Sequence, residues 1–134
     1  MNLLAPLYRL SDRLRHAKLA DTGRRGEDLA HRYLRAKGYT IVARNWRPPT
    51  GPGELDIVAW QGRTLVFIEV KTRTSAEWNA PERDVDGEKT RALQRAARSW
   101  LSREKSGIPN DHYRFDIVAI TGERIEHLMD AFGQ

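Results

Sequence analysis

The sequence predicts a single α/β domain in which a mixed β-sheet is flanked by helices, in the order α-β-β-β-α-β. Three observations predict this class. Segments of helical period alternate with short apolar runs of strand period. A tight-turn signal separates the second and third apolar runs, as in a hairpin. A helical segment separates the third run from the fourth, which favours a parallel pair. The length of 134 residues suits one domain with its own core.

The N-terminal segment, residues 1–20, is basic and weakly amphipathic, and we expect it to be a helical extension of the domain. The domain itself is expected to cover residues 21–134. Its first helix follows Asp21 or Thr22, either of which can cap the first turn. Gly38 stands where a left-handed residue ends the helix.

Three strands are expected next. Residues 39–46 form the first, and the run of Pro and Gly at 48–53 is a loop. The second and third strands flank Gln61-Gly62, which we expect to be the turn of a hairpin.

The rest of the chain completes the α/β order. Residues 72–87 show no periodicity and predict a loop. A second helix is expected from Asp86 to about Lys105, followed by a strand at 113–120. Residues 123–128 allow a short fifth strand.

Four charged residues interrupt the apolar strands of the hairpin. Glu54 and Asp56 precede the turn, and Glu69 and Lys71 follow it. Because burying an unpaired charge is costly, charges within apolar strands indicate a special role.

The predicted turn determines where these charges lie. With Gln61 and Gly62 as its two central residues, Glu54 faces Glu69 directly and Asp56 lies diagonal to it. All three acids and the lysine then share one face, because side chains alternate with period two. A three-residue loop would reverse this parity and separate Asp56 from Glu69.

Carboxylates at such distances repel one another unless protons or a cation neutralise them. The chain has no cysteine and no close histidine pair, so its oxygen ligands suit Mg²⁺ or Mn²⁺. Lys71 points the same way as Glu69 and can orient a water or stabilise the charge of a phosphate. Together these groups predict a site that hydrolyses phosphodiesters. The alternative is a solvated face on which Lys71 only neutralises Glu69.

Several spaced motifs resemble the YraN-like family of bacterial proteins, which is largely uncharacterised. The motifs are Gly26-Glu27-Asp28-x-Ala30, Gly38-Tyr39, Asn45-Trp46-Arg47, Gly53-Glu54-Leu55-Asp56-Ile57, Val66-Phe67-Ile68-Glu69-Val70-Lys71-x-Arg73 and Arg114-Phe115-Asp116. That family is similar to archaeal Holliday-junction resolvases and, more distantly, to restriction endonucleases with the PD-(D/E)-x-K signature. The resemblance covers residues 21–120 and implies a restriction-endonuclease-like fold.

The resemblance also implies functional residues. Asp56, Glu69 and Lys71 would be the catalytic set, and Glu27 would join Asp56 and Glu69 as a metal ligand. From the residues alone, the better interpretation of Glu27 is an exposed acid in a first helical turn, or a partner of His31. Leu55 departs from the signature, which has proline before the aspartate.

The formal charge of +5 and pI of about 9.9 favour a polyanionic partner. The candidate nucleic-acid contacts are Arg73, Lys89, Arg91, Arg95 and Arg98. Lys89 lies on the inward side of the second helix and can reach the cleft, whereas a solvated face is the alternative for the arginines. Asp116 is expected to be structural, in a salt bridge near the edge of the sheet.

We therefore predict a Mg²⁺- or Mn²⁺-dependent nuclease acting on DNA, on branched or damaged structures among others, in DNA processing or repair. RNA is an open second substrate, and the resolvase analogy implies a homodimer, because cutting two strands requires two sites. The alternative is a non-catalytic nucleic-acid-binding or docking module of a DNA-processing complex. The sequence has no membrane-length apolar run and no secretory signal, which indicates a cytoplasmic protein without a membrane partner.

Overall fold

The computed structural model describes residues 23–73, 87–104 and 112–132. The predicted N-terminal extension, the predicted N-terminal caps Asp21 and Thr22, the predicted helix start at Asp86 and most of the predicted loop after the hairpin lie outside the described residues. In the described part of the chain, no helix is long and apolar enough to cross a membrane.

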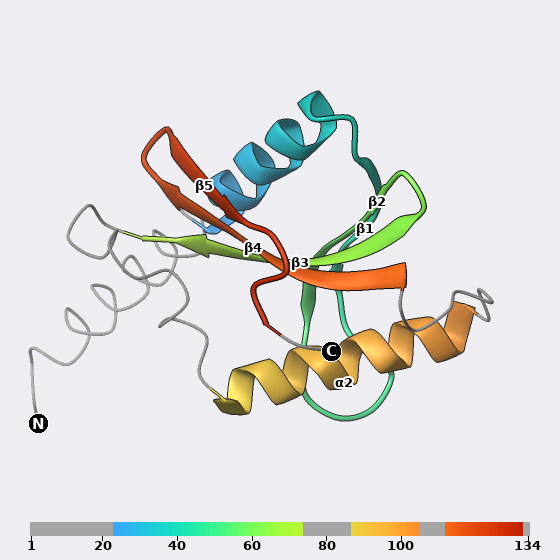
Figure 1. The fold of residues 1–134 in the computed structure, drawn as a ribbon. Helices are drawn as coiled ribbons and strands as arrows, with labels where there is room; N and C mark the ends of the chain where they lie inside the picture. Colours follow the sequence, from blue (N-terminus) through green and yellow to red (C-terminus); the bar gives the residue numbers. More distant parts are fainter. Residues whose placement is uncertain (1–22, 74–86, 105–111, 133–134) are drawn as a thin grey trace, which may run out of the picture.

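Five strands form one mixed sheet (Figure 1). They are β1 (Thr40–Trp46), β2 (Leu55–Gln61), β3 (Thr64–Thr72), β4 (Tyr113–Thr121) and β5 (Arg124–Leu128). Their order in space is their order in the sequence. Only β3 and β4 run parallel, because α2 (Gly87–Glu104) connects them. The predicted parallel pair is confirmed, and the arrangement is consistent with the predicted fold class. β5 confirms the short fifth strand that the sequence allows at residues 123–128.

Two helices cover the two faces of the sheet (Figure 1). Residues 23–36 form one of them, called here the Gly26 helix, and α2 lies on the opposite face. As predicted, a left-handed Gly38, with a φ of 93°, follows the end of the Gly26 helix, and the N–H of Tyr39 donates to the carbonyl of Leu34 at 3.0 Å.

Each helix packs on a separate hydrophobic cluster. The cluster under the Gly26 helix consists of Ala30, Leu34, Tyr39, Ile57, Ala59, Val66, Ile68, Val118 and Ile120. The cluster under α2 consists of Leu55, Val58, Leu65, Phe67, Ala96, Ala97 and Phe115. Strands β2 and β3 contribute to both clusters and are buried on both faces, which explains their almost continuous apolar sequence. The acids of the hairpin therefore stand in interior strands.

The hairpin turns one residue later than predicted. Gln61 pairs with Thr64, so the central residues of the turn are Gly62 and Arg63. The φ angle is 58° at Gly62, whereas Arg63 does not have a positive φ. A left-handed first central residue is the requirement of a type II′ turn, and glycine meets it without steric cost. The prediction had placed this glycine second, which is wrong.

This shift changes which residues pair but not which face they occupy. Moving the turn by one residue moves every partner by two, and the side-chain period is also two. Ile57 pairs with Ile68, which brings Asp56 opposite Glu69 instead of diagonal to it. The predicted pairing of Glu54 with Glu69 is wrong for the same reason.

Two glycines bring the helices close to the strands that carry the acids. A Cβ atom on Gly26 would overlap Oγ1 of Thr72 at the end of β3. A Cβ atom on Gly53, just before β2, would lie 2.6 Å from the carbonyl oxygen of Ala92 in α2. Both helices therefore approach the hairpin at positions where any side chain would hold them apart.

Candidate functional site

Asp56 and Glu69 meet where β2 and β3 separate. The backbone ladder between the two strands ends at the pair Ile57 and Ile68. Just beyond it, Oδ2 of Asp56 accepts a hydrogen bond from the backbone N–H of Val70 at 2.9 Å. The carboxylate of Asp56 thus accepts the hydrogen bond of a β3 amide that lies beyond the last β2–β3 pair. This contact fixes the orientation of the Asp56 side chain.

The surroundings of Asp56 disfavour its charge. Burial and the neighbouring charge of Glu69 raise the pKa of Asp56 to about 8, although the hydrogen bond from Val70 acts in the opposite direction. The charge of Glu27 raises the pKa further by a smaller amount. Glu69 is itself only 6% exposed. A buried carboxylate and a half-buried one that interact this closely need a proton or a cation between them.

Lys89, near the start of α2, places a positive charge on this pair. Its Nζ lies 2.6 Å from Oε1 of Glu69. Burial lowers the pKa of Lys89, but the hydrogen bond and the charge of Glu69 outweigh burial and raise it. The sequence indicated that Lys89 could reach the cleft, but not that it would contact Glu69.

Two adjoining hollows surround the acids. One, of about 270 Å³, is lined by Glu27, Glu69 and Lys71 among others. The other, of about 240 Å³, is lined by Asp56 with Glu69 and Lys89 among others. The structure thus brings all four residues of the predicted catalytic and metal sets to connected hollows, and Glu69 and Lys89 line both.

The outer acids of this region pair with arginines. Glu27 Oε2 lies 3.7 Å from Nη2 of Arg44, and the same nitrogen lies 2.8 Å from Oδ1 of Asp28. Glu54 Oε2 lies 3.1 Å from Nη2 of Arg47, which is exposed. Sequence reasoning did not identify Arg44, because its pairing depends on how the Gly26 helix crosses β1.

The donor set fits a hard cation held mainly by two residues. Among the described residues, no three His, Asp or Glu side chains converge as a group able to hold a metal ion. The close pair is Asp56 with Glu69, while Glu27 is oriented toward Arg44. Mg²⁺ commonly takes one or two carboxylates and completes its shell with water and phosphate oxygens. The carboxylates of Asp56 and Glu69, which repel each other and are largely withdrawn from solvent, meet that requirement.

The predicted nucleic-acid contacts fall into two groups. Arg91, Arg95 and Arg98 are exposed on α2. Arg73 differs, because it is only 8% exposed and its backbone N–H donates to the carbonyl of Ile120 at 3.0 Å. The structure thus buries one of the predicted contacts and presents three others to solvent.

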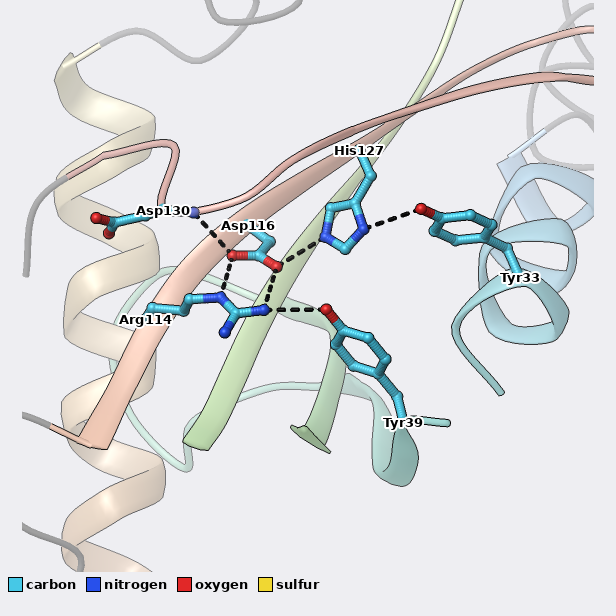
Figure 2. A network of polar contacts seen from close by, with 6 residues as sticks. All are labelled: Tyr33, Tyr39, Arg114, Asp116, His127 and Asp130. Carbon is cyan, nitrogen blue, oxygen red and sulfur yellow. Dashed lines mark hydrogen bonds and ion pairs between the residues drawn. The ribbon is translucent and has the colours of Figure 1, made fainter. Parts of the chain in front are cut away.

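Asp116 lies in a buried polar network on the sheet, as Figure 2 shows. Its carboxylate is fully buried and accepts from Nε of Arg114 at 2.9 Å and from the N–H of Asp130 at 3.0 Å. Nε2 of His127 lies 2.7 Å from its other oxygen. Burial alone would raise the pKa of Asp116, but these hydrogen bonds outweigh it and hold the pKa below its usual value. The predicted salt bridge is confirmed.

The network continues to the Gly26 helix and the segment that follows it. The hydroxyl of Tyr33 lies 3.2 Å from Nδ1 of His127, and the hydroxyl of Tyr39 accepts from Arg114 at 3.0 Å (Figure 2). His127 was not predicted to take part, because 94 residues separate it from Tyr33. The network connects helix and sheet away from the acid pair.

Comparison with known proteins identifies one family. The model of the uncharacterised protein family UPF0102 matches residues 26–120. A UPF0102 protein of Solibacter usitatus is 46% identical over 134 residues, spanning 97% of this chain and 100% of that relative. A UPF0102 protein of Koribacter versatilis is 50% identical over 103 residues, 77% of this chain and 70% of the relative. One of Geobacter sulfurreducens is 46% identical over 115 residues, 82% and 87% of the two chains.

Proposed function

The chain belongs to the uncharacterised protein family UPF0102, the YraN-like family that its motifs resemble, and we propose that it is a metal-dependent nuclease acting on DNA. The observation that carries the proposal is the close pair of half-buried Asp56 and buried Glu69, which interact with each other and line adjoining hollows. The basic net charge and the exposed arginines of α2 support a polyanionic substrate. A cytoplasmic location and a homodimer accompany the proposal.

The proposed roles follow from where the side chains lie. Asp56, held by the amide of Val70, and Glu69 would bind Mg²⁺ or Mn²⁺, and Glu27 would approach from the Gly26 helix. A bound metal would supply Lewis acidity and a nucleophilic water. Lys71 lines the same hollow as Glu69 and Glu27, where its ammonium can orient that water or stabilise negative charge on the phosphate.

Lys89 would neutralise Glu69 when no metal is bound. Its contact with Glu69 at 2.6 Å supplies a positive charge to the pair of Asp56 and Glu69. With a cation held by the acids, the ammonium of Lys89 would turn from Glu69 to a phosphate oxygen of the substrate. Lys89 is half exposed, so this movement does not require unpacking the core.

The test is cleavage of DNA by the purified full-length chain. Linear, flapped and four-way-junction DNA should be cut in Mg²⁺ or Mn²⁺ and left intact in EDTA. Asp56→Asn and Lys71→Met should each lower the rate by about 100-fold or more, because both act at the reacting phosphate. Glu123→Gln is the matched control, since Glu123 is an exposed acid in the β4–β5 turn. Cleavage that persists in EDTA, or in Asp56→Asn, would contradict the proposal.

The contact of Lys89 with Glu69 also favours a second candidate function, a non-catalytic nucleic-acid-binding or docking module. With Lys89 on Glu69, the acidic pair is partly compensated without any metal. A non-catalytic nucleic-acid-binding or docking module would keep this pairing permanently and bind DNA through Arg91, Arg95 and Arg98. DNA binding that is equally tight with and without Mg²⁺, and is never followed by cleavage, would favour this candidate.

A further inference from the structure

Arg44 connects the strand beside Asp56 with the Gly26 helix. Its backbone in β1 pairs with that of Ile57, the residue that follows Asp56. Its guanidinium reaches the helix, where Nη2 donates to Oδ1 of Asp28 at 2.8 Å and lies 3.7 Å from Oε2 of Glu27. A strand of the sheet therefore holds one positive charge beside two successive acids of the helix.

Glu27 lies near the acid pair without joining it. It lines the hollow of about 270 Å³ together with Glu69 and Lys71, and its charge contributes to the raised pKa of Asp56. Among the described residues, however, no three acidic or histidine side chains converge as a group able to hold a metal ion. Glu27 is thus close enough to influence Asp56 and Glu69, but it is not a third acid beside them.

The contact with Arg44 restrains Glu27 only weakly. Nη2 makes its short contact with Asp28, and its distance of 3.7 Å from Glu27 is longer than a hydrogen bond and leaves an electrostatic attraction. The side chains of Glu27 and Arg44 are 20% and 30% exposed. An ion pair that solvent reaches favours one side-chain position by about two- to fivefold. A cation held by Asp56 and Glu69 would attract Glu27 in the opposite direction, so Arg44 opposes that movement.

The number of carboxylates around a hard cation affects which cation is preferred. Ca²⁺ accepts about six to eight oxygen ligands in a flexible shell, several carboxylates among them. Mg²⁺ requires a compact octahedral shell and commonly takes only one or two carboxylates with several waters. A third carboxylate at this site would therefore favour Ca²⁺ more than Mg²⁺.

We propose that Arg44 is a positioning residue that keeps Glu27 out of direct contact with a cation held by Asp56 and Glu69, and thereby favours Mg²⁺ or Mn²⁺ over Ca²⁺. The inference rests on the proposed function, because it concerns the cation of that same site. Arg44 acts through Glu27, and touches neither the cation nor the substrate.

The test compares the affinities of the full-length chain for Mg²⁺ and Ca²⁺ in the absence of DNA. Each cation is used to displace Mn²⁺, whose binding is followed by its effect on water proton relaxation at one fixed salt concentration. Arg44→Met keeps an apolar stem and removes the charge. We expect this variant to raise the affinity for Ca²⁺ about two- to fivefold relative to that for Mg²⁺, because the lost pair restrained Glu27 by about that factor.

Three variants separate the position of Glu27 from a simple change of charge. Arg24→Met is the matched control, because it removes an exposed arginine from the first turn of the same helix, and it should leave the ratio of the two affinities unchanged. Arg44→Lys should also keep the wild-type ratio, because an ammonium in that place still attracts Glu27. In a Glu27→Gln background, Arg44→Met should no longer change the ratio, because the neutral amide is not a third acid.

Glu27→Gln alone tests the assignment even if Arg44→Met fails to fold. The proposal places Glu27 outside direct contact with the cation, whereas Asp56 is one of its two carboxylate ligands. Glu27→Gln should therefore lower the affinity for Mg²⁺ far less than Asp56→Asn does.

Three results would overturn the inference. They are an unchanged ratio of Ca²⁺ to Mg²⁺ affinity in Arg44→Met, a changed ratio that persists in the Glu27→Gln background, and a loss of Mg²⁺ affinity in Glu27→Gln equal to that in Asp56→Asn. Failure of the proposed nuclease is distinguishable, because DNA would stay uncut while the affinities changed as expected. Cleavage in Mg²⁺ together with an unchanged ratio would instead reject the role of Arg44 and leave the nuclease standing.

Discussion

Replacing Asp56 with asparagine is expected to remove a pH-dependent loss of stability from the metal-free protein. The pKa of Asp56 is raised from 3.8 to about 8 in the folded state. Below about pH 4 the group is protonated in both folded and unfolded chains. Between about pH 4 and pH 8 the unfolded chain releases the proton and the folded chain keeps it, so stability falls as the pH rises.

The size of this loss follows from one proton. Where the folded state binds one more proton than the unfolded state, the free energy of unfolding falls by about 1.4 kcal/mol per pH unit. Between pH 5 and pH 7 the loss is therefore roughly 2.5 kcal/mol. The introduced asparagine cannot ionise, and its amide oxygen can still accept from the N–H of Val70, so the variant should lose none of this amount.

The assay is urea denaturation of both proteins in EDTA from about pH 5 to pH 8. The difference between the two free energies of unfolding at each pH cancels the other titrating groups. The free energy of unfolding of Asp56→Asn should rise relative to that of the wild type as the pH rises. The free energy of unfolding of Glu123→Gln should keep a constant difference from that of the wild type. Millimolar Mg²⁺ at neutral pH should stabilise the wild type more than Asp56→Asn. Parallel pH profiles for the wild type and Asp56→Asn would refute the reasoning, because the acid would then be ionised in the folded chain.

Three further predictions concern the surroundings of the acid pair and the buried network. Gly26→Ala should lower the free energy of unfolding by about 1–3 kcal/mol, because its Cβ would overlap Oγ1 of Thr72. Urea denaturation should show most of this loss recovered in a Thr72→Ala background, and equal losses in both backgrounds would contradict the contact. Lys89→Met should tighten Mn²⁺ binding several-fold in calorimetry, because the ammonium no longer competes for Glu69, and unchanged affinity would exclude competition. Asp116→Ala should cost about 3–5 kcal/mol, since it leaves the largely buried guanidinium of Arg114 without its carboxylate partner and the N–H of Asp130 without its acceptor, and thermal unfolding close to that of the wild type would refute this.

The proximity of Asp56 and Glu69 could be predicted from the sequence because it depends only on which face of the hairpin each side chain occupies, and not on the exact pairing of the strands. An error of one residue in the turn moved the partners by two, which returned both acids to the same face. The same error made the predicted pairing of Glu54 with Glu69 wrong, because that pairing depended on absolute register. Gly62 could occupy either central position of a two-residue turn, and only the twist of the paired strands selects the first.

Contacts between distant segments could not be predicted from the sequence. The ion pair of Lys89 with Glu69 joins α2 to β3, and its existence depends on how closely Gly53 lets the helix approach. The pairing of Arg44 with Glu27 likewise depends on the crossing of the Gly26 helix over β1. Helical and strand periods state which face a residue occupies, but not the rotation or depth at which two elements meet.

The hydrogen bond from Val70 to Asp56 has a consequence for how this site can vary among relatives. Its donor is a main-chain amide, so any residue except proline at position 70 can supply it. The side chain of the acid is thus anchored by a group that is identical in almost every possible sequence. Replacing the Val70 amide with an ester, by chemical synthesis, would expose that support while leaving every side chain of the site in place.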